Sequence, residues 1–310
     1  MIRIVFKSDP VRGEEWKKIL VQRAPGLGFH IWPDMGDPAE VRYLVAWDIP
    51  DNVRTLFPNL QIIFATGAGV DHIDFSRIPT DIPVVRMVEP GISAGMVEYV
   101  VMSVLGAHRH LIDYISQQRD GKWRELRVLS AGQRTVGIMG TGVLGTRVLE
   151  ALASFRFQLR VWSRMSRWLG AEVTSFAGAD QLADFLGGCD ILVCLLPLTS
   201  ETRGILNAGC FAAMPPGAFV INASRGGSLV EADLIAALDS GHLSGAILDV
   251  ADKEPLPAGH PFWTHRRILL TPHIATMTQP ETAAVVVLQN IERHRQGLAL
   301  LNVIDRQRGY

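Results

Sequence analysis

The stretch Val136-Gly-Ile-Met-Gly140-Thr-Gly142-Val-Leu-Gly145 decides the fold of this chain. An apolar segment typical of a buried strand leads directly into Gly140, and apolar residues at helical spacing follow from 144 to 152. Because the chain has 29 glycines, the bare G-x-G-x-x-G pattern is weak, but its place between a strand and a helix predicts a dinucleotide-binding turn.

Each glycine of this turn has a physical role. Gly140 permits the tight turn, Gly142 lets the backbone approach a pyrophosphate, and Gly145 lets the helix pack closely on the strand. The free N–H groups at the helix start, at Val143 and Leu144, face the phosphates. The alternative is a glycine-rich turn that binds nothing.

Outward from this turn, apolar strands alternate with helices along the chain. Strands are expected at Ile2–Phe6, Tyr43–Trp47, Ile62–Ala65, Val84–Met87, Thr135–Met139, Leu159–Trp162, Ile191–Leu195, Ala218–Asn222, Gly245–Val250 and Ile268–Thr271. Helices are expected at Glu14–Ala24, from Ser93 to about Arg119, and at Glu281–Gly297. This alternation predicts α/β architecture with doubly wound parallel sheets. We expect residues 99–274 to form the dinucleotide-binding Rossmann domain, inserted in a substrate (catalytic) domain made of residues 1–98 and 275–310.

Composition narrows the function classes. The net charge is −1, with 48 % hydrophobic and 20 % charged residues, so no basic surface favours a nucleic-acid partner. The longest apolar run, near residues 100–107, is shorter than the ~18 residues that span a membrane. The N-terminal segment resembles a strand rather than a signal peptide, and the three cysteines form no metal-binding pattern. We therefore expect a cytoplasmic protein without a metal.

The segment after the second strand of the nucleotide domain indicates which dinucleotide binds. An NAD site would carry Asp or Glu about 20 residues past the glycines, but here Ser163 is followed by Arg164 and then Arg167. A hydroxyl and two guanidinium groups suit a 2′-phosphate, which predicts NADP(H) over NAD(H). An ordinary basic surface loop is the alternative.

Polar residues follow the carboxyl ends of several strands, where ligands bind in such sheets. The residues expected to contact the cofactor there are Leu196, Pro197, Ala223, Ser224, Arg225 and Asp249. His273 follows the last strand, and Glu254 lies five residues past Asp249, close enough to reach His273.

This set suits the reduction of a small 2-oxo acid. Arg225 would hold the carboxylate and polarise the ketone, His273 would donate the proton, and Glu254 would orient the imidazole and favour its protonated form. Taken singly, Arg225 could form a surface ion pair, Glu254 could begin a turn, and His273 could cap a helix. Their occurrence together favours a catalytic set.

A second glycine-rich turn, Gly67-Ala68-Gly69-Val70, follows a strand in the first domain. Successive backbone N–H groups in such a turn can bind a carboxylate, although two glycines in a plain connection would look the same.

Together, the glycine turn, Ala223-Ser-Arg225-Gly, Leu248-Asp249-Val and Thr271-Pro-His273 resemble the D-isomer-specific 2-hydroxyacid dehydrogenases, in order and spacing across nearly the whole chain. The resemblance implies a flavodoxin-like substrate domain beside the Rossmann domain. It also implies that Arg225 and His273 bind substrate, that Glu254 pairs with His273, and that Asp249 holds the nicotinamide carboxamide. The substrate carboxylate would bind the backbone of Ala68, Gly69 and Val70, and Trp47, which on physical grounds could equally be a core residue, would face the substrate.

The resemblance also implies a homodimer, with Trp123 near the interface, and reduction of glyoxylate and hydroxypyruvate with NADPH. Two residues depart from the pattern: many relatives carry Arg-Ile where Val143-Leu144 stand, and an aromatic residue where Ala251 stands. Two alternatives remain. One is a D-2-hydroxyacid dehydrogenase with another substrate preference, and the other is a nucleotide-sensing binding protein of the same fold without enzymatic activity.

Overall fold

The computed structural model describes residues 3–71, 73–165, 170 and 172–306, and the chain forms two compact units. Unit 1 comprises Met1–Ile92 and Thr276–Tyr310, and unit 2 comprises Ser93–Ala275. The chain first passes from unit 1 to unit 2 near the start of a long helix, and not after residue 98. Met96 and Tyr99 of that helix already pack in the core of unit 2.

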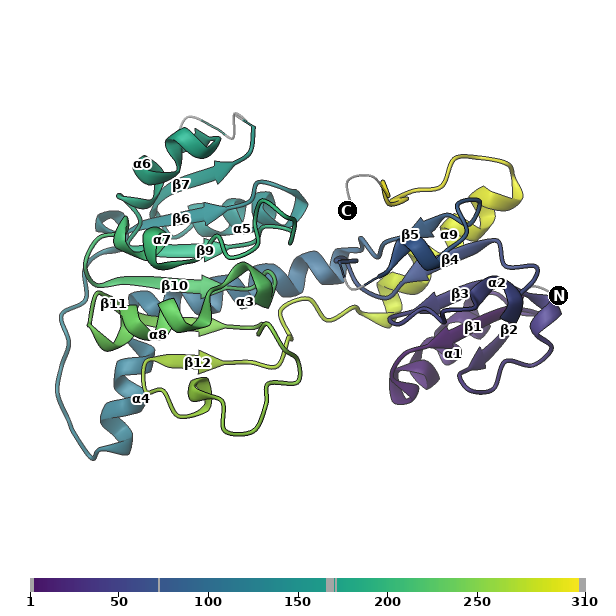
Figure 1. Ribbon diagram of the computed structural model, residues 1–310, viewed down its shortest axis with the longest axis horizontal. Helices are drawn as coiled ribbons and strands as arrows, with labels where there is room; N and C mark the ends of the chain where they lie inside the picture. The colour runs from purple at the N-terminus through teal and green to yellow at the C-terminus, as the bar shows by residue number, and fades with distance from the viewer. Residues whose placement is uncertain (1–2, 72, 166–169, 171, 307–310) are drawn as a thin grey trace. The chain divides into compact units, whose positions relative to one another are not determined.

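Unit 1 is built on a parallel sheet of five strands among the described residues, in the order β2-β1-β3-β4-β5 (Figure 1). Its strands are β1 (Arg3–Lys7), β2 (Gly28–Ile31), β3 (Val41–Ala46), β4 (Ile62–Ala65) and β5 (Val84–Val85). Its α-helices are α1 (Pro10–Arg23), α2 (Val53–Leu56) and α9 (Pro280–Arg295). This strand order is the flavodoxin-like order, with the chain reversing direction between β1 and β3.

Unit 2 is built on a parallel sheet whose described strands number seven, in the order β12-β11-β10-β9-β6-β7-β8. They are β6 (Thr135–Met139), β7 (Gln158–Ser163), β8 (Val173–Ala177), β9 (Ile191–Cys194), β10 (Ala218–Asn222), β11 (Leu243–Leu248) and β12 (Ile268–Leu270). The helices are α3 (Pro90–His108, which begins in unit 1), α4 (Leu111–Arg119), α5 (Val143–Ala153), α6 (Leu182–Leu186), α7 (Ala208–Ala212) and α8 (Glu231–Asp239). The order reverses between β6 and β9, which is where a Rossmann domain binds its dinucleotide. The predicted fold class is thereby confirmed.

Helices cover both faces of the second sheet (Figure 1). Side chains from α3, α4 and α5 pack on one face, and side chains from α6, α7 and α8 pack on the other. The strands are therefore buried on both sides, which is why they consist of nearly continuous apolar residues.

The structure differs from the prediction at two strands and one helix. The sequence missed β2 and β8, which are edge strands with only partial burial and no continuous apolar run. The single long helix predicted from Ser93 to about Arg119 is two helices, because His110 adopts a left-handed conformation with φ of 57° between α3 and α4. A left-handed residue ends a helix wherever it occurs.

Length and composition would let α3 cross a membrane, and it is the one helix in the described part of the chain for which this holds. The prediction from sequence considered only the longest uninterrupted apolar run of this helix, near residues 100–107. The core helix of a globular domain passes the same test, and Met96, Tyr99 and Val100 of α3 are buried in the core of unit 2.

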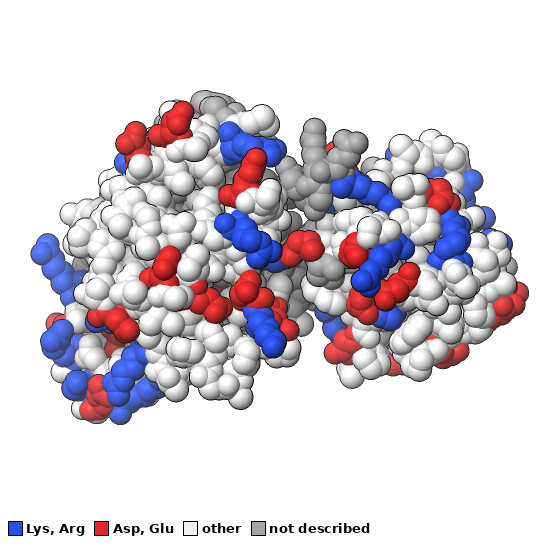
Figure 2. Space-filling view, viewed as in Figure 1, with Lys and Arg blue, Asp and Glu red and all other residues white. Residues whose placement is uncertain are grey.

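On the face shown in Figure 2, acidic and basic side chains are interspersed.

Candidate active site

The glycine turn has a distinct local geometry at each of its three glycines. Gly140 has φ of 106°, a conformation that side chains disfavour, and follows directly from β6. A Cβ at Gly145 would lie 1.9 Å from the carbonyl oxygen of Gly140, so only glycine lets α5 pack this closely on the turn. A Cβ at Gly142 would meet no heavy atom within 4 Å, so this position faces open space at the start of α5. The turn therefore fits a bound pyrophosphate. It leaves an open approach, and the N–H groups of Val143 and Leu144 at the helix start are free to bind the phosphates.

The residues that follow β9 and β10 turn their side chains inward. Leu196 and Ala223 are buried in the two core clusters of unit 2. Ser224 is buried, and its hydroxyl donates to Asn222 Oδ1 at 2.8 Å. These residues can therefore offer a cofactor mainly their backbone atoms.

At the end of β7, Ser163 and Arg164 lie at the predicted 2′-phosphate position. The Ser163 hydroxyl donates to the carbonyl of Met165 at 2.8 Å. The guanidinium of Arg164 is largely exposed and lies 3.9 Å from the Glu201 carboxylate. The third predicted residue, Arg167, lies outside the described residues.

His273 and Glu254 form a close pair. The imidazole Nδ1 of His273 lies 2.8 Å from Glu254 Oε2, and the other carboxylate oxygen accepts the N–H of Ala251 at 3.0 Å. Both oxygens of Glu254 are thus engaged, which fixes the carboxylate and leaves Nε2 of His273 as the ring atom available to a ligand.

The electrostatics of the pair favour an ionised Glu254. Burial alone would raise the pKa of Glu254, but hydrogen bonds from His273 and the Ala251 N–H, with the positive charges of His273 and Arg225, outweigh it. The pKa of Glu254 is therefore held below its ordinary value of 4.5. The backbone beside Arg225 lies close to this pair, because Gly226 packs directly on the backbone of Ala251, and the Arg225 guanidinium donates to the Ser224 carbonyl at 2.8 Å.

Asp249 holds the turn that carries His273. The Asp249 carboxylate accepts hydrogen bonds from the Thr271 hydroxyl at 2.7 Å and from the N–H groups of Ile274 and Ala275, each at 2.8 Å. Its backbone carbonyl accepts the His273 N–H at 2.8 Å. His273 itself has φ of 56°, so this strained conformation is held from both sides.

A second hydroxyl continues this network. Because Thr271 donates to Asp249, it accepts at 2.7 Å from the Tyr99 hydroxyl on α3. Burial, together with the nearby charge of Asp249, raises the pKa of Tyr99 to about 12, although its hydrogen bonds to Thr271 and Ser103 act to lower it. Tyr99 therefore stays a donor at neutral pH. Oδ2 of Asp249 accepts one bond in this network and can take a further donor, such as an amide N–H.

In unit 1, the predicted substrate residues lie at the carboxyl ends of β3 and β4. Trp47 follows β3, and a Cβ added at Gly67 would lie 3.0 Å from its ring, so the indole lies directly on the glycine loop. Trp47 is 42 % exposed, which makes it a surface residue rather than a core residue. Val70 is buried, so the loop Ala68-Gly69-Val70 presents backbone groups in place of that side chain.

Comparison with known proteins identifies the family. The sequence profile of the D-isomer specific 2-hydroxyacid dehydrogenase NAD-binding domain matches residues 101–275. Glyoxylate/hydroxypyruvate reductase A of Yersinia enterocolitica is 39 % identical over 315 residues, covering all of both chains. The chain belongs to the D-isomer specific 2-hydroxyacid dehydrogenase family.

Solved structures of relatives agree with this membership. A D-isomer specific 2-hydroxyacid dehydrogenase from Xanthobacter autotrophicus, in complex with NADPH and MES, is 41 % identical with a TM-score of 0.91 over 99 % of both chains. An NADPH-dependent glyoxylate/hydroxypyruvate reductase from Sinorhizobium meliloti, with NADP and sulfate, is 36 % identical with a TM-score of 0.91 over the full length of both chains.

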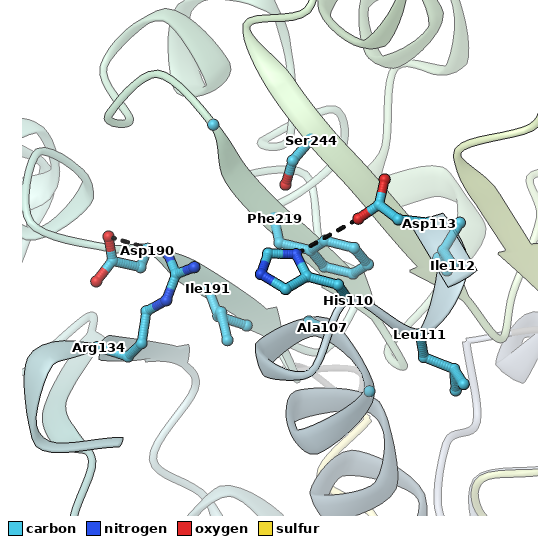
Figure 3. Close-up of a pocket in the computed structure, with 12 residues that line it drawn as sticks. Ala107, His110, Leu111, Ile112, Asp113, Arg134, Asp190, Ile191, Phe219 and Ser244 are labelled. Atoms are coloured by element: carbon cyan, nitrogen blue, oxygen red, sulfur yellow. Dashed lines mark ion pairs between the residues drawn. The ribbon is translucent and has the colours of Figure 1, made fainter. Parts of the chain in front are cut away.

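Apart from the residues of the site, the dehydrogenase has a cavity lined by both apolar and charged side chains. The cavity, of about 70 Å³, lies where β6, β9, β10 and β11 begin (Figure 3). His273 follows the opposite, carboxyl end of β12 in the same parallel sheet. Two ion pairs line it: His110 with Asp113 at 3.4 Å and Arg134 with Asp190 at 3.8 Å. These pairs satisfy local charges, so the cavity adds no reacting group.

Two residues of this dehydrogenase site were missed in the sequence. Thr271 and Tyr99 support Asp249, yet Thr271 entered the sequence argument only as part of the Thr-Pro-His motif. Tyr99 carried no signal, because a tyrosine on an apolar helix is ordinarily a core residue.

Proposed function

We propose that this chain is an NADPH-dependent reductase that converts glyoxylate to glycolate and hydroxypyruvate to D-glycerate. The observation that carries the proposal is the His273–Glu254 pair at the carboxyl end of the nucleotide-binding sheet, with the turn that carries Arg225 packed on the same loop. The relatives named above, which are glyoxylate/hydroxypyruvate reductases or carry bound NADPH or NADP, support it.

Bound NADPH would supply the hydride that reduces the ketone carbon. Arg225 would hold the substrate carboxylate and polarise the ketone, since a guanidinium is permanently charged and bonds a carboxylate through two N–H groups. His273 would donate the proton from Nε2 to the ketone oxygen as the hydride arrives, which balances the reaction to a hydroxy acid and NADP⁺. Glu254, bonded at Nδ1, would hold the ring in the donating orientation.

The residues around the glycine turn would hold the cofactor. Gly140, Gly142 and Gly145 shape the turn, and Ser163 with Arg164 and Arg167 would bind the 2′-phosphate. Asp249 would accept the nicotinamide carboxamide through Oδ2, and Ala68, Gly69 and Val70 would bind the substrate carboxylate by their N–H groups, with Trp47 lining the substrate pocket.

We further propose a cytoplasmic homodimer. Trp123 is fully exposed, and Met102, Leu111 and Tyr114 are each more than a third exposed, so a partner subunit would remove a sizeable apolar surface from water. Light scattering of the wild type and of Trp123→Glu tests this: a monomeric wild type contradicts it.

A substrate panel tests the proposed activity. Purified protein is assayed with glyoxylate, hydroxypyruvate, pyruvate and a branched 2-oxo acid, each with NADPH and with NADH. We expect turnover of the first two and a preference for NADPH. A protein that binds NADPH but oxidises it with no 2-oxo acid would instead support the nucleotide-sensing alternative.

His273→Ala separates chemistry from binding. Turnover should be lost while NADPH affinity, measured by fluorescence titration, stays near that of the wild type. A fully active variant would remove His273 from the role of proton donor.

A further inference from the structure

Glu254 lies on an irregular loop, residues 251–260, between β11 and the short helix Pro261–Trp263. No helix or strand fixes its position. The orientation of His273 therefore depends on how this loop is held against the rest of unit 2.

One carboxylate contacts the loop near both of its ends. Glu231, the first residue of α8, accepts the N–H of Asp252 through Oε1 at 3.4 Å and pairs with Nε2 of His260 through Oε2 at 3.0 Å. Both side chains of the Glu231–His260 pair are at least three-quarters buried. Asp252 and His260 lie on either side of Glu254 in the sequence, so Glu231 closes the loop that carries Glu254.

The hydrogen bonds of the His260 ring fit this arrangement. Its Nδ1 accepts the N–H of Phe262 at 3.3 Å, so in the neutral ring Nε2 carries the hydrogen and donates to Glu231. The ring also packs edge-on against Phe262, with centroids 4.6 Å apart, and Phe262 is fully buried. Both ring nitrogens and the ring itself therefore make contacts that hold the end of the loop in place.

The start of the loop lies directly on the turn that carries Arg225. A Cβ at Gly226 would lie 1.9 Å from the backbone carbon of Ala251 and 2.2 Å from the nitrogen of Asp252. Glu231 follows Gly226 by five residues on the same segment. The segment with Arg225 and the loop with Glu254 are therefore joined by a backbone contact and by the Glu231 carboxylate.

We propose that Glu231, with His260, is a positioning residue of the reaction that fixes Glu254 against His273. The proposal rests on the proposed reductase function. Glu231 acts through the loop and not on the substrate, so its effect should appear in the chemical step and disappear when Glu254 can no longer act.

The first test measures the loop without any substrate. Hydrogen exchange of peptides covering residues 251–260 is compared in the wild type, Glu231→Gln and the control Glu150→Gln, whose carboxylate pairs with Arg147 on the surface of α5. In Glu231→Gln an amide NH₂ replaces one of the two carboxylate oxygens, so either His260 or the Asp252 N–H loses its acceptor, and exchange in the loop should rise about tenfold. Unchanged exchange in the loop would overturn the proposal.

The second test is a double-mutant cycle on turnover. Glu231→Gln should lower kcat about tenfold in the wild-type background, with KM within about twofold, and should change kcat less than about twofold in the Glu254→Gln background. Equal losses in both backgrounds, or a loss confined to KM, would show a general structural role instead.

A conservative substitution completes the test. His260→Gln keeps a side-chain donor and should retain more activity than His260→Ala, and the thermal midpoint of each variant shows that it is folded. Equal activity of the two His260 variants would contradict the proposal. If the wild type itself shows no turnover, the reductase function fails, while the exchange experiment still decides the role of Glu231 in the loop.

Discussion

Gly142→Ala should separate cofactor binding from folding. Gly142 has φ of −71°, which alanine adopts without strain, and an added Cβ would meet no heavy atom within 4 Å. The free protein should therefore tolerate the methyl group. In the complex, however, the methyl group would occupy the space through which the pyrophosphate approaches the backbone.

The magnitude follows from the bonds at risk. A hydrogen bond to a charged group contributes about 1.5–3 kcal/mol, so displacement of one phosphate contact should weaken NADPH binding about 10- to 150-fold. Gly145→Ala should also affect folding, because its Cβ would lie 1.9 Å from the Gly140 carbonyl oxygen and must displace the turn itself. That variant should lose stability, by about 1–3 kcal/mol, as well as affinity.

The assay pairs NADPH titration with thermal unfolding of the unliganded protein. Gly132→Ala is the matched control, since its Cβ would meet only the Arg156 carbonyl oxygen at an ordinary 3.6 Å. We expect Gly142→Ala to unfold like the control but bind NADPH far more weakly. Wild-type affinity in Gly142→Ala would refute the assignment of this turn to the pyrophosphate, and a lowered unfolding midpoint would refute the reading of its geometry.

Three further outcomes are expected from the same site. Arg164→Ala should weaken NADPH by about 1–3 kcal/mol and leave NADH unchanged, as titrations with both cofactors would show; equal losses would contradict 2′-phosphate binding. Because the folded-state pKa of Glu254 is depressed, the stabilising pair with His273 persists above pH 4.5 and is lost as pH falls through the lower folded value. Unfolding midpoints of wild type and Glu254→Gln should therefore converge only below pH 4.5, and convergence at neutral pH would count against the pair. Thr271→Val removes a donor to the buried Asp249 carboxylate and should lower the free energy of unfolding by about 1–3 kcal/mol in urea, with a fall in kcat; an unchanged variant would argue against the network.

The sequence predicted the interior of the fold better than its edges. Central strands such as β6 and β10 were placed with their observed bounds, because strands buried on both faces consist of continuous apolar residues. The edge strands β2 and β8 are partly exposed and mix polar with apolar residues, so periodicity gave no clear signal. The break at His110 also escaped notice, since a left-handed backbone at a histidine leaves no pattern in neighbouring residues.

The approach of Glu254 to His273 could be anticipated for a related reason. Parallel strands bring their carboxyl ends to one edge of the sheet, so residues after β11 and β12 must lie near each other. How the pair is held could not be anticipated. Tyr99 reaches Thr271 across 172 positions of sequence, and Glu231 reaches His260 across 29.

These supporting contacts share a property that hides them from sequence reasoning. Each joins a residue with an ordinary local role, such as a tyrosine on an apolar helix or a glutamate in the first turn of α8, to a loop whose path no periodicity describes. The reacting groups are recognisable because the chemistry restricts their residue types. The groups that hold them need only a hydrogen bond of the right length, which many residue types can supply. The supporting residues Glu231 and Tyr99 therefore emerge only from the three-dimensional arrangement, and the variants that test them must be judged by their effect on His273 rather than by their own chemistry.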